Sequence, residues 1–238
     1  MNIALRGISS MATRALLDAL SRLYADTRGV QVRVESVGGV DAARRIAAGE
    51  PFDFAVLAAD AIDKLAAAGH LEAAGRVPLA RSDVAVAVPA GARQPDIGSA
   101  DAVRRAVLAA PAIGYSTGPS GVALLALFQR WGIAGQVRDR LVQAPPGVPV
   151  GALLADGRVA LGFQQTSELQ DLPGIDLLGP LPEDIRITTT FTAAPCRGTA
   201  QADAVRELLD WFASPACDDI RSRSGMAAAR EERQEPPQ

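Results

Sequence analysis

Three serine-rich turns hold the residues of this chain that are best suited to chemistry. Ser9-Ser10 follows a short apolar stretch, Ser36-Val37-Gly38-Gly39 follows a second one, and residues 116–121 hold a third set of hydroxyls and glycines. We expect each turn to lie between a strand and a helix. The first N–H groups of a helix lack an internal partner and its dipole makes that end electropositive, so such turns can bind anions. Serine is also a common helix cap, but three such turns together predict a site for a small anion.

Other kinds of reaction lack the residues that they need. The chain has a single histidine, His70, and no serine in a G-x-S-x-G context, which disfavours a catalytic triad. A P-loop and a G-x-G-x-x-G motif are both missing, and no acidic or histidine pair has metal-ligand spacing. We therefore expect neither a cofactor nor a metal. Because His70 follows Gly69 at the end of a predicted helix, a capping or surface role is expected for it.

The composition of the 238 residues is that of a globular protein, with 48% hydrophobic and 21% charged residues. A net charge of −3 with dispersed basic residues argues against nucleic acid or an anionic membrane surface as a partner. No apolar run is long enough for a transmembrane helix, so membrane insertion is not expected. We favour two free, buried thiols at Cys196 and Cys217, although the pair could form a disulfide in an oxidising compartment.

Strand-like and helical patterns alternate along most of the chain. In the first eighty residues, the predicted strands are 3–5, 30–34 and 52–58, and the predicted helices are 12–24, 42–48 and 61–68. This order predicts a parallel sheet with helices on both faces. A second set has strands at 112–115, 141–143 and 160–164 and helices at 102–109, 122–131 and 148–155, followed by a loop with Gly174, Gly179, Pro180 and Pro182.

Two further strands, predicted at 83–88 and 185–193, look like crossings between two lobes. One lobe would then comprise residues 1–83 and 187–228, including helices at 202–212 and 215–223, and the other residues 84–186. The charged, proline-containing tail 229–238 is expected to be disordered or loosely attached. Two crossing strands form a hinge, and the cleft between the lobes is the natural place for a ligand.

The order of these segments resembles the type II periplasmic solute-binding fold, in its molybdate-binding-like branch. The matching segments extend to about residue 226 and are 7–10, 36–40, 49–57, 81–88, 118–121, 156–165 and 179–182. The resemblance implies an α/β protein with two lobes, each a mixed, mostly parallel sheet flanked by helices, joined by two hinge strands. It also implies a monomeric small-anion binding protein of the ABC-transporter type that closes on its ligand and can meet a permease.

The same resemblance implies a set of ligand-binding positions. In that family, serine hydroxyls and the N–H groups of helix starts hold the oxyanion, which here implies Ser9, Ser10, Ser36, Gly38, Gly39, Ser120, Gly121 and Val150. Three further candidate ligand-binding residues follow from their own chemistry and place in the sequence, without the resemblance. Arg6 can hold a carboxylate through two parallel hydrogen bonds, Tyr115 ends a predicted strand, and Gln164 ends another strand at the edge where open α/β sheets bind ligands.

Two departures from the molybdate pattern favour an organic carboxylate as the ligand. Arg6 stands where a neutral residue suits a bare oxyanion, and Gln164-Gln165-Thr166 stands where an aromatic hydroxyl is expected. The chain also resembles the aconitate isomerase branch of the family, whose reaction moves a double bond within a tricarboxylate. That reaction needs a carboxylate clamp and an acid/base group, and the sequence identifies no catalytic residue.

Three functions therefore stay open: a binding protein for a molybdate-like oxyanion or organic carboxylate, an isomerase of the aconitate type, and a ligand-sensing module. The resemblance implies a periplasmic location. The first residues lack the pattern of a secretory leader, so either the protein is cytoplasmic or the numbering begins at a processed or differently assigned start.

Overall fold

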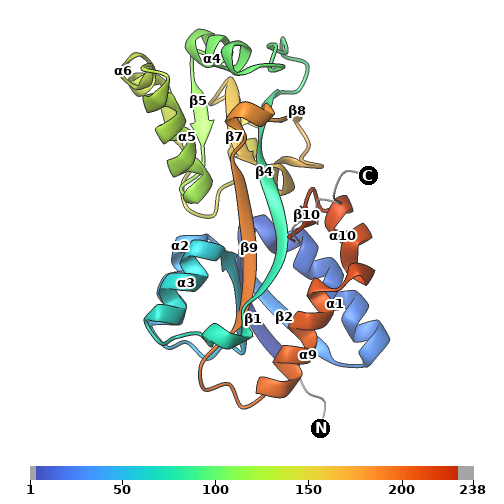
Figure 1. Cartoon of the computed structure of the whole chain (residues 1–238). Coiled ribbons are helices and arrows are strands. Elements are labelled where there is room, and N and C mark those ends of the chain that lie inside the picture. The colour runs from blue at the N-terminus through green and yellow to red at the C-terminus, as the bar shows by residue number, and fades with distance from the viewer. Residues whose placement is uncertain (1–3, 230–238) are drawn as a thin grey trace, which may run out of the picture.

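Two long strands, β4 (Val77–Pro89) and β9 (Thr188–Pro195), run side by side through the middle of the molecule and join its two lobes (Figure 1). The computed structural model describes residues 4–229. Strand β4 pairs with β9 as far as Asp83, and from Val84 onward it pairs with strands of the other lobe. The chain therefore passes from one lobe to the other within a continuous strand.

The first lobe is built from both ends of the chain. Its other strands are β1 (Ala4–Ser10), β2 (Gln31–Val37), β3 (Phe54–Ala58) and the short β10 (Ala227–Ala228). Its helices are α1 (Arg14–Arg28), α2 (Gly39–Ala47), α3 (Ala59–Ala67), α9 (Ala202–Ala213) and α10 (Asp218–Arg223), with short 3-10 turns at η1 (Met11–Thr13), η2 (Ala73–Gly75) and η5 (Pro215–Cys217). Alternate residues of β3 pack on opposite faces: Phe54 contacts the core under α1 and α9, and Ala55 contacts the core under α2 and α3.

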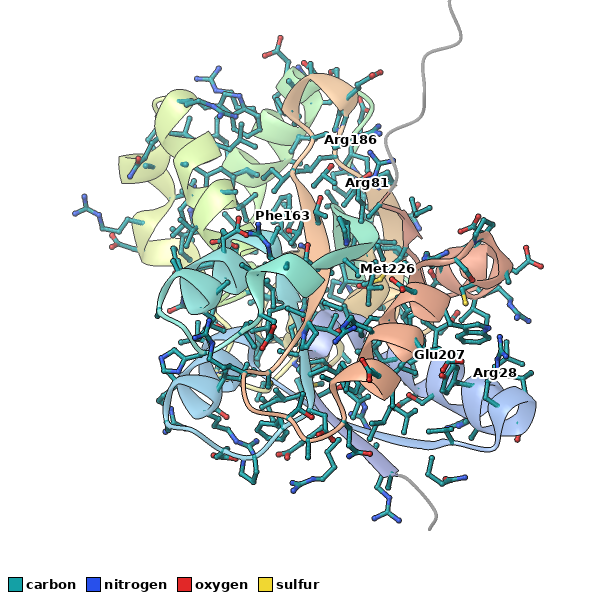
Figure 2. All side chains as sticks on the ribbon, turned by 60° about the horizontal axis from the view of Figure 1, so that its bottom comes forward. Arg28, Arg81, Phe163, Arg186, Glu207 and Met226 are labelled. Atoms are coloured by element: carbon teal, nitrogen blue, oxygen red, sulfur yellow. The ribbon has the colours of Figure 1, made fainter. Side chains whose placement is uncertain are left out.

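The second lobe is built from the middle of the chain. Its strands are β5 (Ile113–Tyr115), β6 (Leu141–Gln143), β7 (Leu161–Gln165) and β8 (Ile175–Pro180). Its helices are α4 (Ala100–Ala109), α5 (Pro119–Arg130), α6 (Ala134–Val137), α7 (Val150–Ala155) and α8 (Thr166–Leu169), with 3-10 turns at η3 (Arg138–Arg140) and η4 (Glu183–Ile185). Val86 of β4 and Phe163 of β7 face α4 and α5, and Phe163 is labelled in Figure 2. Ala85 and Ala87 face the opposite core, against α7.

The sheet connects the two lobes in the order β2-β1-β3-β9-β4-β7-β5-β6, with β8 and β10 also paired to β4. Strands β1, β2 and β3 are parallel, as are β5, β6 and β7, while β4 and β9 run antiparallel to their neighbours. This arrangement confirms the predicted fold class: two α/β lobes, each around a mixed, mostly parallel sheet, with two hinge strands.

The structure differs from the sequence-based expectations at several element boundaries. Ser9 and Ser10 are the last residues of β1 rather than a turn after it, because β1 is a central strand paired on both sides, with Ser36 and Val56 opposite Ser9. Strand β8 and helix α8 occupy a stretch for which the sequence predicted only a loop, and α6 was not predicted. Ile185 belongs to η4, so the returning strand begins later, at Thr188.

Polar contacts tie the hinge together. Asp83 of β4 lies 3.9 Å from Arg186 and accepts a hydrogen bond from Thr188, where the two crossing strands meet. Arg81 instead donates to the carbonyl of Ala228 at 3.2 Å, and Figure 2 shows Arg81 and Arg186 near this crossing. Arg81 and Asp83 therefore contact different partners.

Both cysteines are free and buried, as favoured from the sequence. Burial raises the pKa of the Cys196 thiol to about 12 and also raises the pKa of Cys217, so both thiols stay protonated and unreactive at neutral pH. Within residues 4–229, no helix has the length and apolar character of a membrane span. The predicted tail falls almost entirely on residues 230–238, which lie outside the described part of the chain.

Candidate functional site

A cleft of about 780 Å³ opens between the lobes. The first lobe lines it with the end of β1, the end of β3 and the starts of α2 and α3. The second lobe contributes the turn before α5, the loop before α7 and the end of β7. Figure 1 shows α2 and α3 of one lobe and α5 of the other on the same side of β4 and β9. A volume of this size accommodates a small organic molecule.

Helices α2, α3 and α5 begin at this cleft without a capping side chain. The N-cap residues of α2, α3 and α5 are Gly38, Ala58 and Gly118, none of which has a side-chain hydrogen-bond acceptor. The N–H groups of the first turns therefore cannot be satisfied by an N-cap side chain, and a bound anion can accept hydrogen bonds from them. Since these starts come from both lobes, an anion in the cleft can be held from two sides.

Ser10 provides a hydroxyl at the base of the cleft in the first lobe. The residue is only 8% exposed, and its Oγ has no hydrogen-bond partner within residues 4–229. A Cβ placed on Gly39 would lie 3.6 Å from the Ser10 Cβ, so this hydroxyl lies next to the start of α2. On the neighbouring positions of β1 and β2, the Oγ atoms of Ser9 and Ser36 bond to each other at 2.8 Å. A buried hydroxyl without a partner is unfavourable, so its place in the cleft points to a ligand.

The second lobe presents a turn of hydroxyls before α5. The Oγ atoms of Ser116 and Ser120 lie 3.0 Å apart, and both residues line the cleft together with Thr117. Gly121 lies just behind this turn. A Cβ there would come within 1.9 Å of the Ser116 carbonyl oxygen, so only glycine lets α5 start this close to the turn.

A chain of hydrogen bonds links α7, β7 and α8 of the second lobe. The Val150 N–H, at the start of α7, donates to Oε1 of Gln164 at 2.7 Å, and Nε2 of Gln164 donates to Oε1 of Glu168 at 2.8 Å. Burial raises the pKa of Glu168 to about 7, although the hydrogen bond from Gln164 opposes this rise. Beside it, Nε2 of Gln165 donates to Thr189 at 2.7 Å, while its buried Oε1 has no partner among the described residues.

The structure brings together many of the residues that the sequence singled out. Ser10, Gly38, Gly39, Ser120 and Gln164 line the cleft. Four others do not line it: Ser9 and Ser36 bond to each other, Gly121 adjoins the Ser116 carbonyl, and Val150 donates to Gln164. Tyr115 is partly buried and packs on the core of the second lobe rather than lining the cleft. A ligand-binding role for any of these residues remains a prediction.

Arg6 is not brought to the cleft, which corrects the idea that it clamps a carboxylate there. It is exposed, with its guanidinium 5.7 Å from the centre of the Phe52 ring, and its backbone N–H donates to the Asp53 carboxylate at 2.8 Å. Because β1 continues through Ser10, Arg6 sits four residues earlier along the strand, about 13 Å from the end that meets the cleft.

Outside the serine-rich turns and the Gln164-Gln165 pair, five residues with polar or charged side chains line the cleft, and none of them was predicted as a site residue: Asp60, Lys64, His70, Glu168 and Thr189. Asp60 and Lys64 lie one turn apart on α3, with 3.7 Å between their charged groups. His70 follows α3 and lines the cleft, although the sequence favoured a capping or surface role. For Glu168, the available signal was its spacing of four residues from Gln164.

Within residues 4–229, no group of three or more His, Cys, Asp or Glu side chains is arranged to hold a metal ion. The polar groups that face the cleft are instead hydroxyls, amides, helix-start N–H groups and a few charged side chains. Such a set is suited to holding an anion by hydrogen bonds, and Glu168 adds a group that can exchange a proton near neutral pH.

Comparisons with known proteins match nearly the whole chain. A family model described as bacterial extracellular solute-binding protein matches residues 5–227. An aconitate isomerase from Pseudomonas sp is 34% identical over 227 residues, which is 92% of this chain and 86% of that protein. The structure of the periplasmic molybdate-binding protein of Azotobacter vinelandii superposes with a TM-score of 0.79 at 18% identity, over 95% of this chain and 100% of that one. The sulfate-binding protein SubI from Mycobacterium tuberculosis H37Rv gives a TM-score of 0.75 at 15% identity, over 95% of this chain and 87% of that one.

Proposed function

Since this chain belongs to the bacterial extracellular solute-binding protein family, we propose that it binds a small organic polycarboxylate between its lobes. The observation that carries this proposal is that uncapped helix starts from both lobes and the unpartnered hydroxyl of Ser10 line the same cleft. Carboxylate oxygens are suitable acceptors for all of these donors.

The apolar part of the cleft favours an organic anion over a bare oxyanion. Alanines and valines lie between the polar groups, among them Ala43, Ala61, Ala123 and Ala126. A tetrahedral oxyanion presents oxygen on every side, whereas a polycarboxylate separates its charges by carbon that can contact these side chains. The relative named aconitate isomerase supports a tricarboxylate within this class.

Exposed valines at the edge of the cleft support closure on the ligand. Val40 at the start of α2 is 70% exposed and Val122 at the start of α5 is 67% exposed, and both line the cleft from opposite lobes. Rotation of residues 84–186 against residues 1–83 and 187–228 about β4 and β9 would bury this apolar surface. In this role, the protein acts as a monomer in the periplasm and passes its ligand to an ABC-transporter permease.

A second candidate function, an isomerase of the aconitate type, is favoured by Glu168. A binding site needs only donors for its anion, whereas this cleft also contains a desolvated carboxyl group whose pKa is raised to about 7. Groups with such a pKa are typical of proton transfer near neutral pH. The relative that is 34% identical supports the same function.

Thermal unfolding with candidate ligands tests the binding proposal. The panel is citrate, cis-aconitate, trans-aconitate, molybdate, tungstate and sulfate. A tricarboxylate at about a hundred times its Kd should stabilise the folded state by about 2.7 kcal/mol, which corresponds to a Tm increase of about 5 to 10 °C. A Tm increase with molybdate or tungstate alone would overturn the proposal in favour of an oxyanion.

The hydroxyl of Ser10 should contribute to ligand binding but not to the stability of the ligand-free protein. We expect Ser10→Ala to weaken tricarboxylate binding by about 10-fold, the effect of losing a hydrogen bond to a charged group. The free energy of unfolding of the ligand-free variant should not fall, because the lost hydroxyl has no partner in the free protein. Calorimetric titration and urea unfolding measure the two effects.

Ser21→Ala is the matched control for this prediction. Ser21 on α1 is also 8% exposed with an unpartnered Oγ, but it does not line the cleft. Its replacement should leave the tricarboxylate Kd unchanged. Equal Kd values for the two variants would exclude the Ser10 hydroxyl from the binding site.

A further inference from the structure

We propose that the carboxyl group of Glu168 is the acid/base group that moves a proton on the bound ligand, and that Gln164 positions it. This inference rests on the proposed binding of a polycarboxylate in the cleft. Glu168 lies on α8, directly after β7, and lines the cleft while remaining partly buried. Its side chain therefore adjoins both the protein interior and the space for the ligand.

The hydrogen bonds around Gln164 fix how the carboxyl group is held. Because the Val150 N–H can only donate, the atom of Gln164 that meets it at 2.7 Å must be Oε1. The amide NH2 is thereby directed at Glu168, whose Oε1 accepts at 2.8 Å. This acceptor role is compatible with either protonation state, since a proton can sit on Oε2. Oε2 has no hydrogen-bond partner within residues 4–229 and can therefore exchange a proton with a ligand.

The surroundings of Glu168 explain why it can both take and return a proton. Helix α8 packs against β4, β7, β8, α7 and η1. The charged residues on these elements are Arg81 and Asp83 on β4 and Asp176 on β8, while β7, α7 and η1 have none. The rise in the pKa of Glu168 comes from desolvation and is opposed by Gln164, with no contribution from a charged neighbour. Both the acid and the base form are therefore present near pH 7.

The other titratable groups of the cleft are less suited to this task. Asp60 and Lys64 are 58% and 81% exposed and lie 3.7 Å from each other, so they stay in contact with water and with one another. His70 follows α3 and also lines a second cavity beside Cys196 and Arg197. It is the most direct competitor for the role, and the experiment below includes it.

The proposed step is a proton shift between two carbons of an unsaturated polycarboxylate. The carboxylate form of Glu168 removes a proton from the saturated carbon next to the double bond. The electron pair of that C–H bond forms the new double bond, and the electron pair of the old double bond takes the proton from the carboxyl group at the far carbon. Glu168 ends in its starting form, and no oxidant, reductant or cofactor takes part.

Proton NMR in D2O tests the inference on the full chain with cis-aconitate and trans-aconitate as probes. The wild-type protein should interconvert the two isomers and incorporate deuterium at the ligand carbons. Glu168→Gln should bind the probes within about 3-fold of the wild-type Kd but lose at least 100-fold in rate, the usual contribution of an acid/base group. Glu168→Asp should lose less, because it retains a carboxyl group. His70→Gln should lose less than Glu168→Gln, and a larger loss in His70→Gln would assign the acid/base role to His70 instead.

Gln164→Ala tests the positioning role separately. The hydrogen bond from Gln164 lowers the pKa of Glu168, so its loss should raise that pKa and move the limb of the pH–rate profile that reports Glu168 to higher pH. Loosened packing alone would not produce this shift.

Each outcome separates this inference from the binding proposal. If the wild-type protein binds neither isomer, the proposed function fails. If it binds them without deuterium incorporation, or if Glu168→Gln keeps the wild-type rate, the role of Glu168 is overturned while the binding proposal stands. Thermal unfolding of each variant shows that it is folded before its rate is compared.

Discussion

Replacement of Gly121 with alanine should lower the free energy of unfolding by about 3 kcal/mol, as expected for a substitution that overpacks a rigid contact. The Cβ of alanine would lie 1.9 Å from the carbonyl oxygen and 2.9 Å from the carbonyl carbon of Ser116. Both are backbone atoms, so no side chain can turn away to relieve the contact. The first turn of α5 would have to move away from the hydroxyls of Ser116 and Ser120, and tricarboxylate binding should weaken by more than 10-fold. Urea unfolding and calorimetric titration measure the two effects.

Gly118→Ala provides the control in the same turn. Gly118 is the N-cap of α5 with a φ of −81°, and a Cβ there would have no neighbour within 4 Å. The change in the free energy of unfolding should stay below about 1 kcal/mol, the typical effect of a weaker N-cap residue. Similar losses for the two variants would show that glycine at these positions matters for backbone freedom and not for the close approach at Ser116.

The alternation of strands and helices could be predicted from the sequence because its signals are local. Buried strands such as β3 are continuous apolar runs, and helices such as α3 end at glycines with positive φ, here Gly69 at 81°. Strand β6 was predicted with the bounds that the structure has, Leu141–Gln143. These patterns require no knowledge of what each element packs against.

Elements that depend on distant partners could not be predicted in this way. Strand β8 has glycine and proline at its end and no regular alternation of buried and exposed residues, and it exists because it pairs with the second half of β4. Ser9 and Ser10 extend β1 because Ser9 pairs with both β2 and β3 and Ser10 pairs with Val37 of β2. The residues of each segment alone predict a loop in the first case and a turn in the second.

In the candidate site, too, residues with local sequence signals could be predicted and residues that depend on distant partners could not. Serines and glycines before helix starts are a local signal, and Ser10, Gly38, Gly39 and Ser120 all line the cleft. The side chain of Arg6 has suitable chemistry, but the length of β1 places it away from the cleft. Glu168 lies on a helix that was not predicted, and its raised pKa results from burial by elements that are distant in the sequence. The sequence therefore identified candidate anion-binding residues but not the candidate acid/base residue.

The same burial gives Glu168 a measurable effect on stability. Replacement of Glu168 with glutamine should stabilise the ligand-free protein at alkaline pH relative to the wild-type protein. Because the pKa is raised from its usual 4.5 to about 7, the folded state disfavours the ionised carboxyl by up to about 3 kcal/mol. Below about pH 4.5 the carboxyl group is neutral in both the folded and the unfolded wild-type protein, so it costs no stability. As the pH rises from there through 7, the free energy of unfolding of the wild-type protein falls, because the unfolded state ionises more easily than the folded state. Glutamine has no charge to bury at any pH, so the difference between the two proteins should grow across this range.

Urea unfolding of both proteins at pH 4.5, 6, 7 and 8.5 measures this difference, and all other titrating groups cancel in the comparison. We expect nearly equal free energies of unfolding at pH 4.5 and an advantage of about 2 to 3 kcal/mol for Glu168→Gln at pH 8.5. A difference that does not change with pH would mean that the carboxyl group is solvated in the free protein, and Glu168 would then lack the property that suits it to proton transfer. A difference that grows as expected would mean that the protein retains a destabilising group in its cleft, which is typical of residues kept for function.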